Sequence, residues 1–429
     1  MKRHPPVQVF EYDRLFVDDK VFTRKHWEDL GFYNSKNDSR FFDLLPNGVR
    51  FKQYVGVIQV GNLTIEVLPK VDRSELNEGQ WQTVLLDMLR ECRWMQVHAH
   101  QEASLRLKHN NILDAYLEMY LDACVRLLHE GLVKKYRQQE GNLYALKGKL
   151  KFAGHISRNV VHQERFYTEH SIYDRDNIFN RILLKALRAV PQFTNSPLLK
   201  DKLGRLLLDF PDLPDMAVTA RTFQNLVYDR KTERYKSAIE IAAMLLLNYR
   251  PDVRGGRNHV LAILFDMNEL WEEYFYRRAR ATLIKEYPAW SINRQRQKDF
   301  WQLPELGRTK IIKPDIVLSK KEGTQEAFII IDTKWKTPDG NIPSDGDLKQ
   351  VFVYNEYWGA MHGMLLYPQN ESGQGFTGRK GKYVGRTYCT VAKVDVLKVV
   401  QTSEGEKASV LNKDFAKPVL NYLINEEKD

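Results

Sequence analysis

The chain has 429 residues, the length of about three domains at roughly 150 residues each. Hydrophobic residues make up 43% of it and charged residues 28%, which excludes an intrinsically disordered or collagen-like chain. Lys and Arg number 65 against 55 Asp and Glu, and the formal charge of +10 permits a polyanionic partner without requiring one.

The first region, residues 1–78, is predicted to be rich in β-strands. Apolar residues alternate through residues 54–71 on both sides of Gly61-Asn62, a dipeptide typical of hairpin turns. Pro69 has no backbone N–H to donate and is therefore expected to end the second strand.

The second region, residues 79–250, is predicted to be mostly helical. Apolar residues recur at helical spacing from Trp81 onward and again over residues 112–132, where Gly131 is a typical helix-end signal. We expect a short strand within residues 146–152 and further helices at 176–190, 197–210 and 237–248. Residues 250–258 are rich in Arg, Gly and Pro, which indicates a domain boundary.

The third region, residues 258–429, mixes helices and strands and predicts an α/β domain around a central sheet. The expected elements are a helix at 267–284, strands at 309–318 and 327–335, a helix at 347–360, strands at 363–367 and 387–396, and a terminal helix. Residues 371–386 are interpreted as a glycine-rich basic loop. The predicted fold class of the whole chain is multidomain α+β.

The most informative motif lies in this third region. Pro314-Asp315 is followed by Asp332-Thr333-Lys334, and four apolar residues, 328–331, stand directly before Asp332. Such a run predicts a strand covered on both faces. Because side chains two apart in a strand share a face, Asp332 and Lys334 should project together while Thr333 points away. Asp315 begins a second strand, from which it can reach the same point.

Two carboxylates and a lysine suit metal-assisted hydrolysis of a phosphodiester. Mg²⁺, for which Mn²⁺ can substitute, prefers oxygen ligands, and it activates water and stabilises the leaving oxygen. A lysine can orient the attacking water or offset charge on the phosphate. The arrangement of Asp315, Asp332 and Lys334 resembles the PD-(D/E)xK nuclease motif. The alternative is a proline-initiated strand beside an ordinary Asp–Lys surface pair.

Two flanking helices carry further candidates. Glu272 and Glu273 flank the apolar stripe of the helix at 267–284, and either can lean toward a metal, the alternative being a solvated acidic edge. Gln350 and Tyr354 share a helical face because they are four residues apart. Gln350 can bind a phosphate or a metal-bound water, the alternative being an amphipathic helix with a buried tyrosine.

The order of the motifs along the chain resembles the McrC family, the nuclease subunit of McrBC-type restriction systems. The stretches that carry this resemblance are residues 65–70, 128–136, 146–152, 174–185, 270–274, 313–315, 330–335, 350–354, 365–368 and 389–391. They extend over most of the chain in the expected order.

The resemblance implies a PD-(D/E)xK endonuclease of double-stranded DNA with little activity alone. Members of the family join a hexameric AAA+ GTPase, McrB, through an N-terminal stalk that enters the ring, so residues 79–250 become the candidate partner-binding region. By this match Asp315, Asp332 and Lys334 form the catalytic set with Gln350 as an accessory, and Asp315, Asp332 and Glu272 are the metal ligands for Mg²⁺. Candidate contacts to DNA phosphates are Arg308, Lys310, Lys313, Lys380 and Lys382, with a solvated loop as the alternative for the last two.

Other functions and locations fit the sequence less well. A GxxxxGK[ST] motif is absent, so the chain itself is not expected to hydrolyse GTP. His98 and His100 lack further ligands at useful spacing, which favours a solvated loop over a metal site. The rival function is a non-catalytic DNA-binding or scaffold subunit of a defence complex.

A cytoplasmic protein outside the membrane is expected. The first residues contain no apolar signal-peptide core, and no apolar run is long enough to span a bilayer. Three cysteines without a CxxC pair exclude a disulfide framework and a thiolate zinc cluster, which fits a reducing compartment.

Overall fold

The computed structural model describes residues 5–70, 78–94, 111–250, 260–322, 325–336, 338, 342–369, 375–384, 387–401 and 407–426. The chain forms two compact units. Unit 1 is built mainly on Ala103–Ile263, and unit 2 on Pro5–Ile58, Thr64–Glu102 and Leu264–Asp429. The predicted division into three domains stays a prediction, because the packing of segments within one unit does not show whether each segment is a separate domain. Most of the predicted boundary at 250–258 lies outside the described residues.

Helices form the body of unit 1, as expected. The principal helices are α4 (Ile112–His129), α6 (Ile178–Ala189), α7 (Pro197–Asp209), α8 (Ala220–Gln224) and α9 (Lys236–Leu247), followed by strands β10 (Tyr249–Arg250) and β11 (Val260–Asp266). Helix α6 packs on α9, and α4 packs on both α7 and α9. The Tyr120 hydroxyl of α4 donates to the Leu183 carbonyl of α6 across this core, at 2.7 Å. Gly131 has φ +84° just after α4, which confirms it as the helix-end signal.

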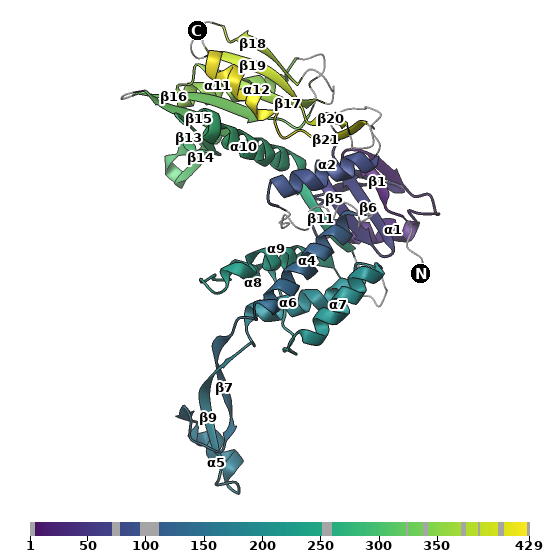
Figure 1. Cartoon of the computed structure of the whole chain (residues 1–429), viewed down its shortest axis with the longest axis vertical. Coiled ribbons are helices and arrows are strands. Elements are labelled where there is room, and N and C mark those ends of the chain that lie inside the picture. The colour runs from purple at the N-terminus through teal and green to yellow at the C-terminus, as the bar shows by residue number, and fades with distance from the viewer. Residues whose placement is uncertain are drawn as a thin grey trace. The chain divides into compact units, whose positions relative to one another are not determined.

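A long two-stranded extension leaves the helices of unit 1 (Figure 1). Strands β7 (Lys135–Leu143) and β9 (Phe166–Asp174) pair antiparallel along nine residues. Strand β8 (Lys149–Leu150) and helix α5 (Phe152–Asn159) lie at the far end of this extension, which we call the finger (residues 135–174). The short strand expected within 146–152 is restricted to β8, because α5 begins at Phe152.

The N-terminal part of unit 2 is rich in β-strands, as expected. It contains β1 (Val7–Phe10), β2 (Arg14–Phe16), α1 (Arg24–Ser35), β3 (Phe42–Leu45), β4 (Gly48–Phe51), β5 (Tyr54–Val60), β6 (Leu63–Leu68) and α2 (Glu78–Glu91). The turn between β5 and β6 has Gly61 at φ +56°, which confirms the predicted hairpin. Strand β1 adds to β6 in parallel. Helix α1 was not expected.

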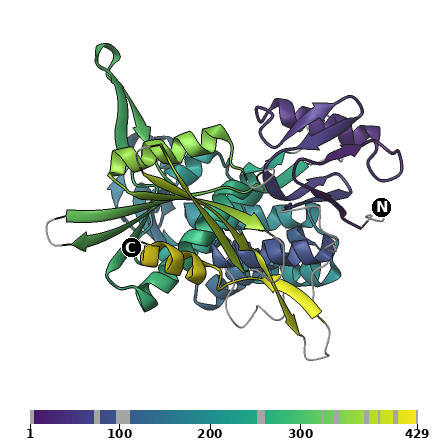
Figure 2. The ribbon, with the colours of Figure 1, turned by 90° about the horizontal axis from the view of Figure 1, so that it is seen from above.

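The C-terminal part of unit 2 is an α/β arrangement around one six-stranded sheet. Its strands run in the order β12-β15-β16-β17-β19-β18, and β16, β17 and β19 are parallel. Their bounds are β12 Trp290–Arg294, β15 Ile316–Glu322, β16 Gln325–Thr333, β17 His362–Gln369, β18 Phe376–Lys382 and β19 Tyr388–Asp395. Helix α11 (Asp345–Trp358) covers one face, and α10 (Met267–Glu286) and α12 (Ala416–Glu426) cover the other (Figure 2).

Two expectations for this part were wrong. The strand expected at 309–318 is two strands, because the proline-containing stretch 313–315 separates β14 (Arg308–Ile312) from β15. Strand β14 pairs with β13 (Lys298–Leu303) in a separate hairpin. The expected basic loop at 371–386 contains an edge strand, β18, since residues 376–382 pair along β19. A second small hairpin, β20 (Leu397–Gln401) and β21 (Lys407–Leu411), was also not expected.

In the part of the chain that the structure describes, no helix has the length and apolar character needed to cross a membrane.

Candidate active site

The predicted site begins where β16 ends. Ile329, Ile330 and Ile331 are buried, and Asp332 continues this run with a fully buried carboxylate. Lys334 Nζ lies 2.7 Å from Asp332 Oδ2. The predicted shared side of Asp332 and Lys334 is therefore confirmed. Burying an ion pair costs desolvation free energy, so the Asp332–Lys334 pair is weak evidence for a stabilising role. Such costly pairs are more often found at functional sites, which favours a chemical role.

Asp315 stands opposite Asp332 across two paired strands. In the antiparallel register of β15 and β16, Ile316 pairs with Ile331, so the next position in each strand places Asp315 against Asp332. Asp315 Oδ2 accepts hydrogen bonds from the Thr333 backbone N–H at 2.8 Å and from its hydroxyl at 3.0 Å. Thr333 was expected to point away from Asp332 and Lys334, and no role was expected for it. It binds the carboxylate of Asp315 through two hydrogen bonds.

Helix α11 supplies two more polar groups to the same place. Lys334 Nζ donates to Gln350 Oε1 at 3.0 Å, and Gln350 Nε2 donates to the Tyr354 hydroxyl at 2.7 Å. The Tyr354 hydroxyl in turn donates to the Lys313 carbonyl at 3.1 Å. These contacts confirm that Gln350 and Tyr354 share a face, and they fix the lysine from a second element.

A glycine in β17 allows this helix to lie close to the sheet. A Cβ atom on Gly363 would stand 2.4 Å from Val351 Cγ1 and 2.7 Å from Asn355 Oδ1 of α11. Both distances are shorter than any ordinary contact. Because Gln350 and Tyr354 belong to the same helix, the missing side chain at Gly363 sets how near they come to Lys334.

Glu272 lies beside the site but is held by other residues. Its Oε1 accepts from Arg294 Nε at 2.7 Å and from Gln295 Nε2 at 3.1 Å. Arg294 also pairs with Glu273, which pairs with Arg277 as well. Both glutamates are buried, so the alternative of a solvated acidic edge is wrong.

Burial raises the pKa values of the three acids. The pKa of Asp332 is raised by desolvation and by the neighbouring charge of Asp315, against the lowering effect of Lys334. Desolvation also raises the pKa of Asp315, against the hydrogen bonds of Thr333, and that of Glu272, to which Asp315 adds. Burial disfavours the charged form of Lys334, but its pair with Asp332 outweighs this and raises the pKa of the lysine.

The side chains present fit a divalent cation of the hard class. Asp332 Oδ1 is buried and accepts no hydrogen bond from any residue that the structure describes, and Oδ2 faces Lys334 without hydrogen-bond geometry. Mg²⁺ is usually held by one or two carboxylates and keeps several waters, which matches Asp315 and Asp332. Among the described residues, no three His, Cys, Asp or Glu side chains converge as a metal-binding group, so Glu272 is not assembled with the two aspartates.

The candidate DNA-binding lysines are placed differently from one another. Lys313 is exposed next to Asp315, and its Nζ donates to Gln295 Oε1 at 3.3 Å. Lys380 and Lys382 of β18 lie over the ring of Tyr388, at 4.8 and 5.3 Å from its centroid.

The register of the sheet shows which face these β18 residues occupy. Arg379 pairs with Val391, Val391 with Leu365, and Leu365 with Asp332, so Arg379 shares the face of Asp332. Lys380 and Lys382 therefore point to the opposite face. On that face Phe376 of β18 meets Tyr422 of α12.

One contact beside the site joins residues that are far apart in the chain. Trp335, directly after Lys334, donates its indole N–H to Glu11 Oε1 at 2.6 Å, and the Lys70 backbone N–H donates to the same oxygen at 2.9 Å. Trp335 also packs on Trp271 of α10, with ring centroids 5.5 Å apart. Sequence reasoning missed this contact, since nothing near Glu11 or Trp335 signals a partner 324 positions away. His98 and His100 lie outside the described residues.

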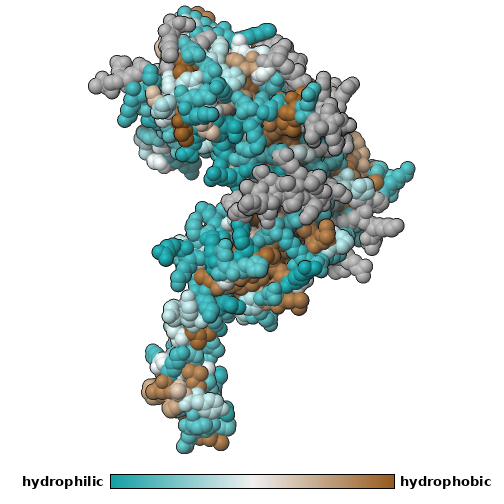
Figure 3. Space-filling model, viewed as in Figure 1, coloured by the Kyte–Doolittle hydropathy of each residue, from teal (hydrophilic) through white to brown (hydrophobic). Residues whose placement is uncertain are grey.

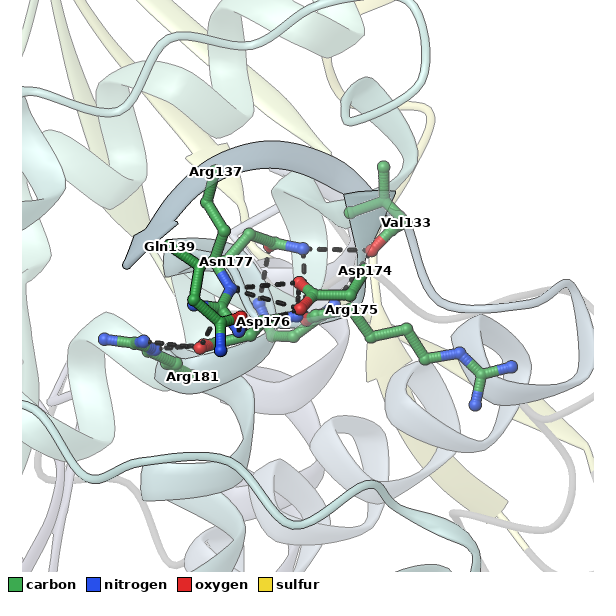
Figure 4. A network of polar contacts seen from close by, with 9 residues as sticks. Val133, Arg137, Gln139, Asp174, Arg175, Asp176, Asn177 and Arg181 are labelled. Atoms are coloured by element: carbon green, nitrogen blue, oxygen red, sulfur yellow. Dashed lines mark hydrogen bonds and ion pairs between the residues drawn. The ribbon is translucent and has the colours of Figure 1, made fainter. Parts of the chain in front are cut away.

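A second set of polar contacts holds the root of the finger in unit 1 (Figure 4). Arg137 of β7 pairs with Asp174 at 2.9 Å and lies 3.4 Å from Asp176, which also pairs with Arg181 of α6. Asn177 Nδ2 donates to the Val133 carbonyl at 2.9 Å. Both strands of the finger are thereby tied to the helical body where they leave it.

The end of the finger exposes apolar side chains to solvent. Figure 3 shows brown surface over this part, and the exposed residues are Tyr144, Leu146, Phe152, Ile156, Val160 and Val161. Phe152 and Ile156 are one helical turn apart on α5, of whose residues only Asn159 is buried. An exposed apolar end on a paired two-stranded extension is typical of a protein-binding surface.

Comparison with known families gives one match over most of the chain. Residues 49–368 match the family described as McrBC 5-methylcytosine restriction system component. The type IV methyl-directed restriction enzyme EcoKMcrBC of Escherichia coli K12 is 20% identical over 254 residues, which cover 56% of this chain and 70% of that protein.

Two solved structures from Thermococcus gammatolerans share the fold. One is the refined half-complex from a tetradecameric assembly of McrB AAA+ hexamers with bound McrC, with a TM-score of 0.71, 18% identity, and coverage of 97% of this chain and 100% of that chain. The other is the McrBC complex, with a TM-score of 0.51, 20% identity, and coverage of 65% and 87%.

Proposed function

The chain belongs to the McrBC family of 5-methylcytosine restriction system components, and on this premise we propose that it is the nuclease subunit, of McrC type, and cuts double-stranded DNA. The observation that carries the proposal is the end of β16. There a fully buried Asp332, whose two carboxylate oxygens accept no hydrogen bond from the described residues, stands beside Lys334 and opposite Asp315. Such a set is costly for stability and suits a PD-(D/E)xK hydrolase.

Each residue of the set has a role in this proposal. Asp315 and Asp332 would hold Mg²⁺, or Mn²⁺ in its place, through carboxylate oxygens. When bound there, such a cation would supply polarisation of the phosphate and a lower pKa of the attacking water. Lys334 orients the attacking water and offsets charge that develops on the phosphate. Gln350 and Tyr354 hold Lys334 in position, and Thr333 holds Asp315.

Glu272 is the less direct member of the proposed metal site. Its carboxylate is neutralised by Arg294 and is not assembled with the two aspartates in the described residues. Burial raises the pKa of Glu272, and the neighbouring charge of Asp315 raises it further, so Glu272 lies within electrostatic reach of the site. To bind the cation directly, Glu272 would have to give up its ion pair with Arg294.

The proposed partner is an AAA+ GTPase ring of McrB type, with the finger as the element that enters it. The McrC in the Thermococcus gammatolerans assembly is bound to McrB AAA+ hexamers. The finger offers a narrow two-stranded shape, an apolar end and a braced root, which suit insertion into a ring.

Cleavage with and without the cation tests the nuclease. The full chain, mixed with its AAA+ partner, GTP and methylated duplex DNA, should cut in Mg²⁺ and should stop cutting when EDTA removes the cation. The rival, a non-catalytic DNA-binding or scaffold subunit, predicts no cleavage in either condition and no uptake of divalent cation.

Stimulation of the partner's GTP turnover tests the finger. Phe152→Ser with Ile156→Ser should reduce stimulation, because both apolar side chains face solvent on α5. Leu208→Ser, at a still more exposed leucine on α7, is the control and should leave stimulation unchanged. A chain truncated at residue 250 is a poorer test, since residues 5–58 and 64–102 pack with the C-terminal part in unit 2.

A further inference from the structure

The β13–β14 hairpin stands out from the ribbon around the sheet in unit 2 (Figure 2, upper left). It carries three large apolar side chains that are about half exposed, namely Phe300 at 46%, Trp301 at 51% and Ile311 at 52%. A two-stranded hairpin with apolar side chains in water is only marginally stable by itself. The exposed apolar side chains therefore suggest that the hairpin binds another molecule.

The register of the hairpin separates its side chains into two unlike faces. Lys298 pairs with Ile312, Trp301 with Lys310, and Leu303 with Arg308, so these residues share one face. The shift in register between Asp299 and Trp301 lets Phe300 lean to this face as well. The other face carries Asp299, Ile311, Gln302 and Thr309. Among the paired positions, one face is therefore aromatic and basic, and the other holds Asp299. Glu305 lies in the turn between the two strands.

The cations of the first face are available to a ligand. In the described part of the chain, Arg308 and Lys310 are exposed and form no ion pair or hydrogen bond through their side chains. Lys298, by contrast, donates to the Tyr357 carbonyl at 2.7 Å and lies 5.0 Å from the ring of Trp358. Arg308 and Lys310 are therefore the two charges that remain to bind an anion.

The root of the hairpin is fixed to the helix that serves the candidate active site. Phe300 packs on Tyr357 with ring centroids 5.3 Å apart, and the Tyr357 hydroxyl donates to the Phe300 carbonyl at 3.2 Å. Ile312 is buried in a cluster with Tyr354 and Trp358. Both anchor points lie on α11, which also carries Gln350. The aromatic and basic face is therefore fixed to the helix whose Gln350 binds Lys334.

We propose that the β13–β14 hairpin (residues 298–312), which we call the arm, binds duplex DNA through this face next to the point of cleavage. In this proposal Arg308 and Lys310 contact backbone phosphates, and Trp301 packs against the nucleotides between them. Charge complementarity selects the partner, because the two free cations share a face whose paired positions carry no acid. Aromatic packing with basic side chains is a common way to hold nucleic acid without reading its sequence.

The reach of the arm fits this role. Lys310 and Arg308 precede Asp315 by five and seven residues, so at about 3.3 Å per residue they lie within roughly 17 and 23 Å of it. Phosphates of one strand are spaced about 3.4 Å along the axis. The arm thus contacts phosphates up to about seven nucleotides from the cut. The inference rests on the proposed nuclease function for the identity of the DNA as substrate.

Binding of the full chain to a fluorescein-labelled 30-base-pair duplex in EDTA tests the arm without cleavage. Arg308→Gln with Lys310→Gln should lower the slope of log affinity against log salt by about two. Trp301→Ala should also weaken binding, because the indole loses its packing against the nucleotides. Wild-type tryptophan fluorescence should change on adding DNA, and Trp301→Phe should remove that change.

Gln302→Ala with Thr309→Ala, on the opposite face, is the matched control and should bind as the wild type does. Thermal unfolding of each variant separates lost binding from lost folding. Unchanged affinity and salt slope in the charge variant would overturn the arm. So would a change in oligomeric state with unchanged DNA affinity, which would assign the face to a second copy of the chain.

These outcomes are independent of the nuclease test. If the wild type cuts DNA and the arm variants bind normally, the arm is wrong and the nuclease stands. If the wild type never cuts but the arm variants bind more weakly, the arm stands and the chemistry is wrong.

Discussion

Glu11 accepts the indole N–H of Trp335 at 2.6 Å, and this hydrogen bond joins the first strand of unit 2 to the residue that follows Lys334. Glu11 is buried, and no described residue donates a hydrogen bond to its second oxygen, Oε2. Burial raises the pKa of Glu11 to about 8. The N-terminal segment of unit 2 is therefore attached to the residue that follows β16 and Lys334 through one carboxyl group, which is neutral when the protein is folded at moderate pH.

Replacing Glu11 should lower the free energy of unfolding by an amount that depends on whether the new side chain can accept hydrogen bonds. Glu11→Met keeps the size but leaves the buried N–H groups of Trp335 and Lys70 without an acceptor, which costs about 1–3 kcal/mol for each unsatisfied group. Glu11→Gln keeps an accepting oxygen and should retain most of the stability. Urea unfolding at pH 5 measures both, and equal losses in the two variants would contradict the account.

The same residue predicts a pH dependence. The pKa of Glu11 in the folded chain lies above its ordinary value of 4.5, so its contribution is complete below pH 4.5 and is lost as the pH rises to about 8. Gln at this position does not titrate. The stability of Glu11→Gln relative to the wild type should therefore increase between pH 5 and pH 8, by on the order of a few kcal/mol. A difference that does not depend on pH would show that Glu11 ionises normally.

Gly363→Ala should damage both stability and cleavage. The new Cβ would overlap Val351 and Asn355, which forces α11 away from the sheet and costs about 1–3 kcal/mol. Gln350 moves with the helix and releases Lys334. Gly346→Ala in the same helix is the control, because its Cβ would meet only Ser344 Oγ at 3.8 Å. Thermal unfolding and a cleavage assay should separate the two variants, and similar behaviour would remove the proposed role of Gly363.

Lys380 and Lys382 should contribute less to DNA binding than Arg308 and Lys310. Both lysines point to the sheet face opposite that of Asp332, whereas the β13–β14 hairpin is fixed to α11 on the face of Asp332. Neutralising each pair to Gln and measuring affinity across a salt series compares them directly. A larger loss from the Lys380 and Lys382 pair would place the DNA on the other face.

The sequence predicted the elements whose periodicity is strong and local. The helices around Leu121, Leu183 and Leu245 and the strand through Ile330 were found where expected, because each buries a regular apolar stripe. Strands β13, β14 and β18 were not separated or recognised. Their side chains are largely exposed, so pairing with a neighbour, rather than an apolar pattern, makes them strands.

The candidate site was predictable where its residues are neighbours in one strand or helix. The spacing of Asp332 and Lys334, and of Gln350 and Tyr354, is enough to place them together. The contacts of Thr333 with Asp315, of Arg294 with Glu272 and of Glu11 with Trp335 depend on how separate segments pack. No local pattern encodes such pairings, so they required the structure.

The measurement that tests the central claim most directly is cleavage of DNA by Asp332→Asn and Asp395→Asn, each with the AAA+ partner, GTP and Mg²⁺. Both aspartates are buried at the carboxyl ends of parallel strands in the same sheet, but only Asp332 faces Lys334. We expect Asp332→Asn to abolish cleavage while it still folds and still stimulates GTP turnover, and Asp395→Asn to cut DNA. Full cleavage by a folded Asp332→Asn chain would contradict the account.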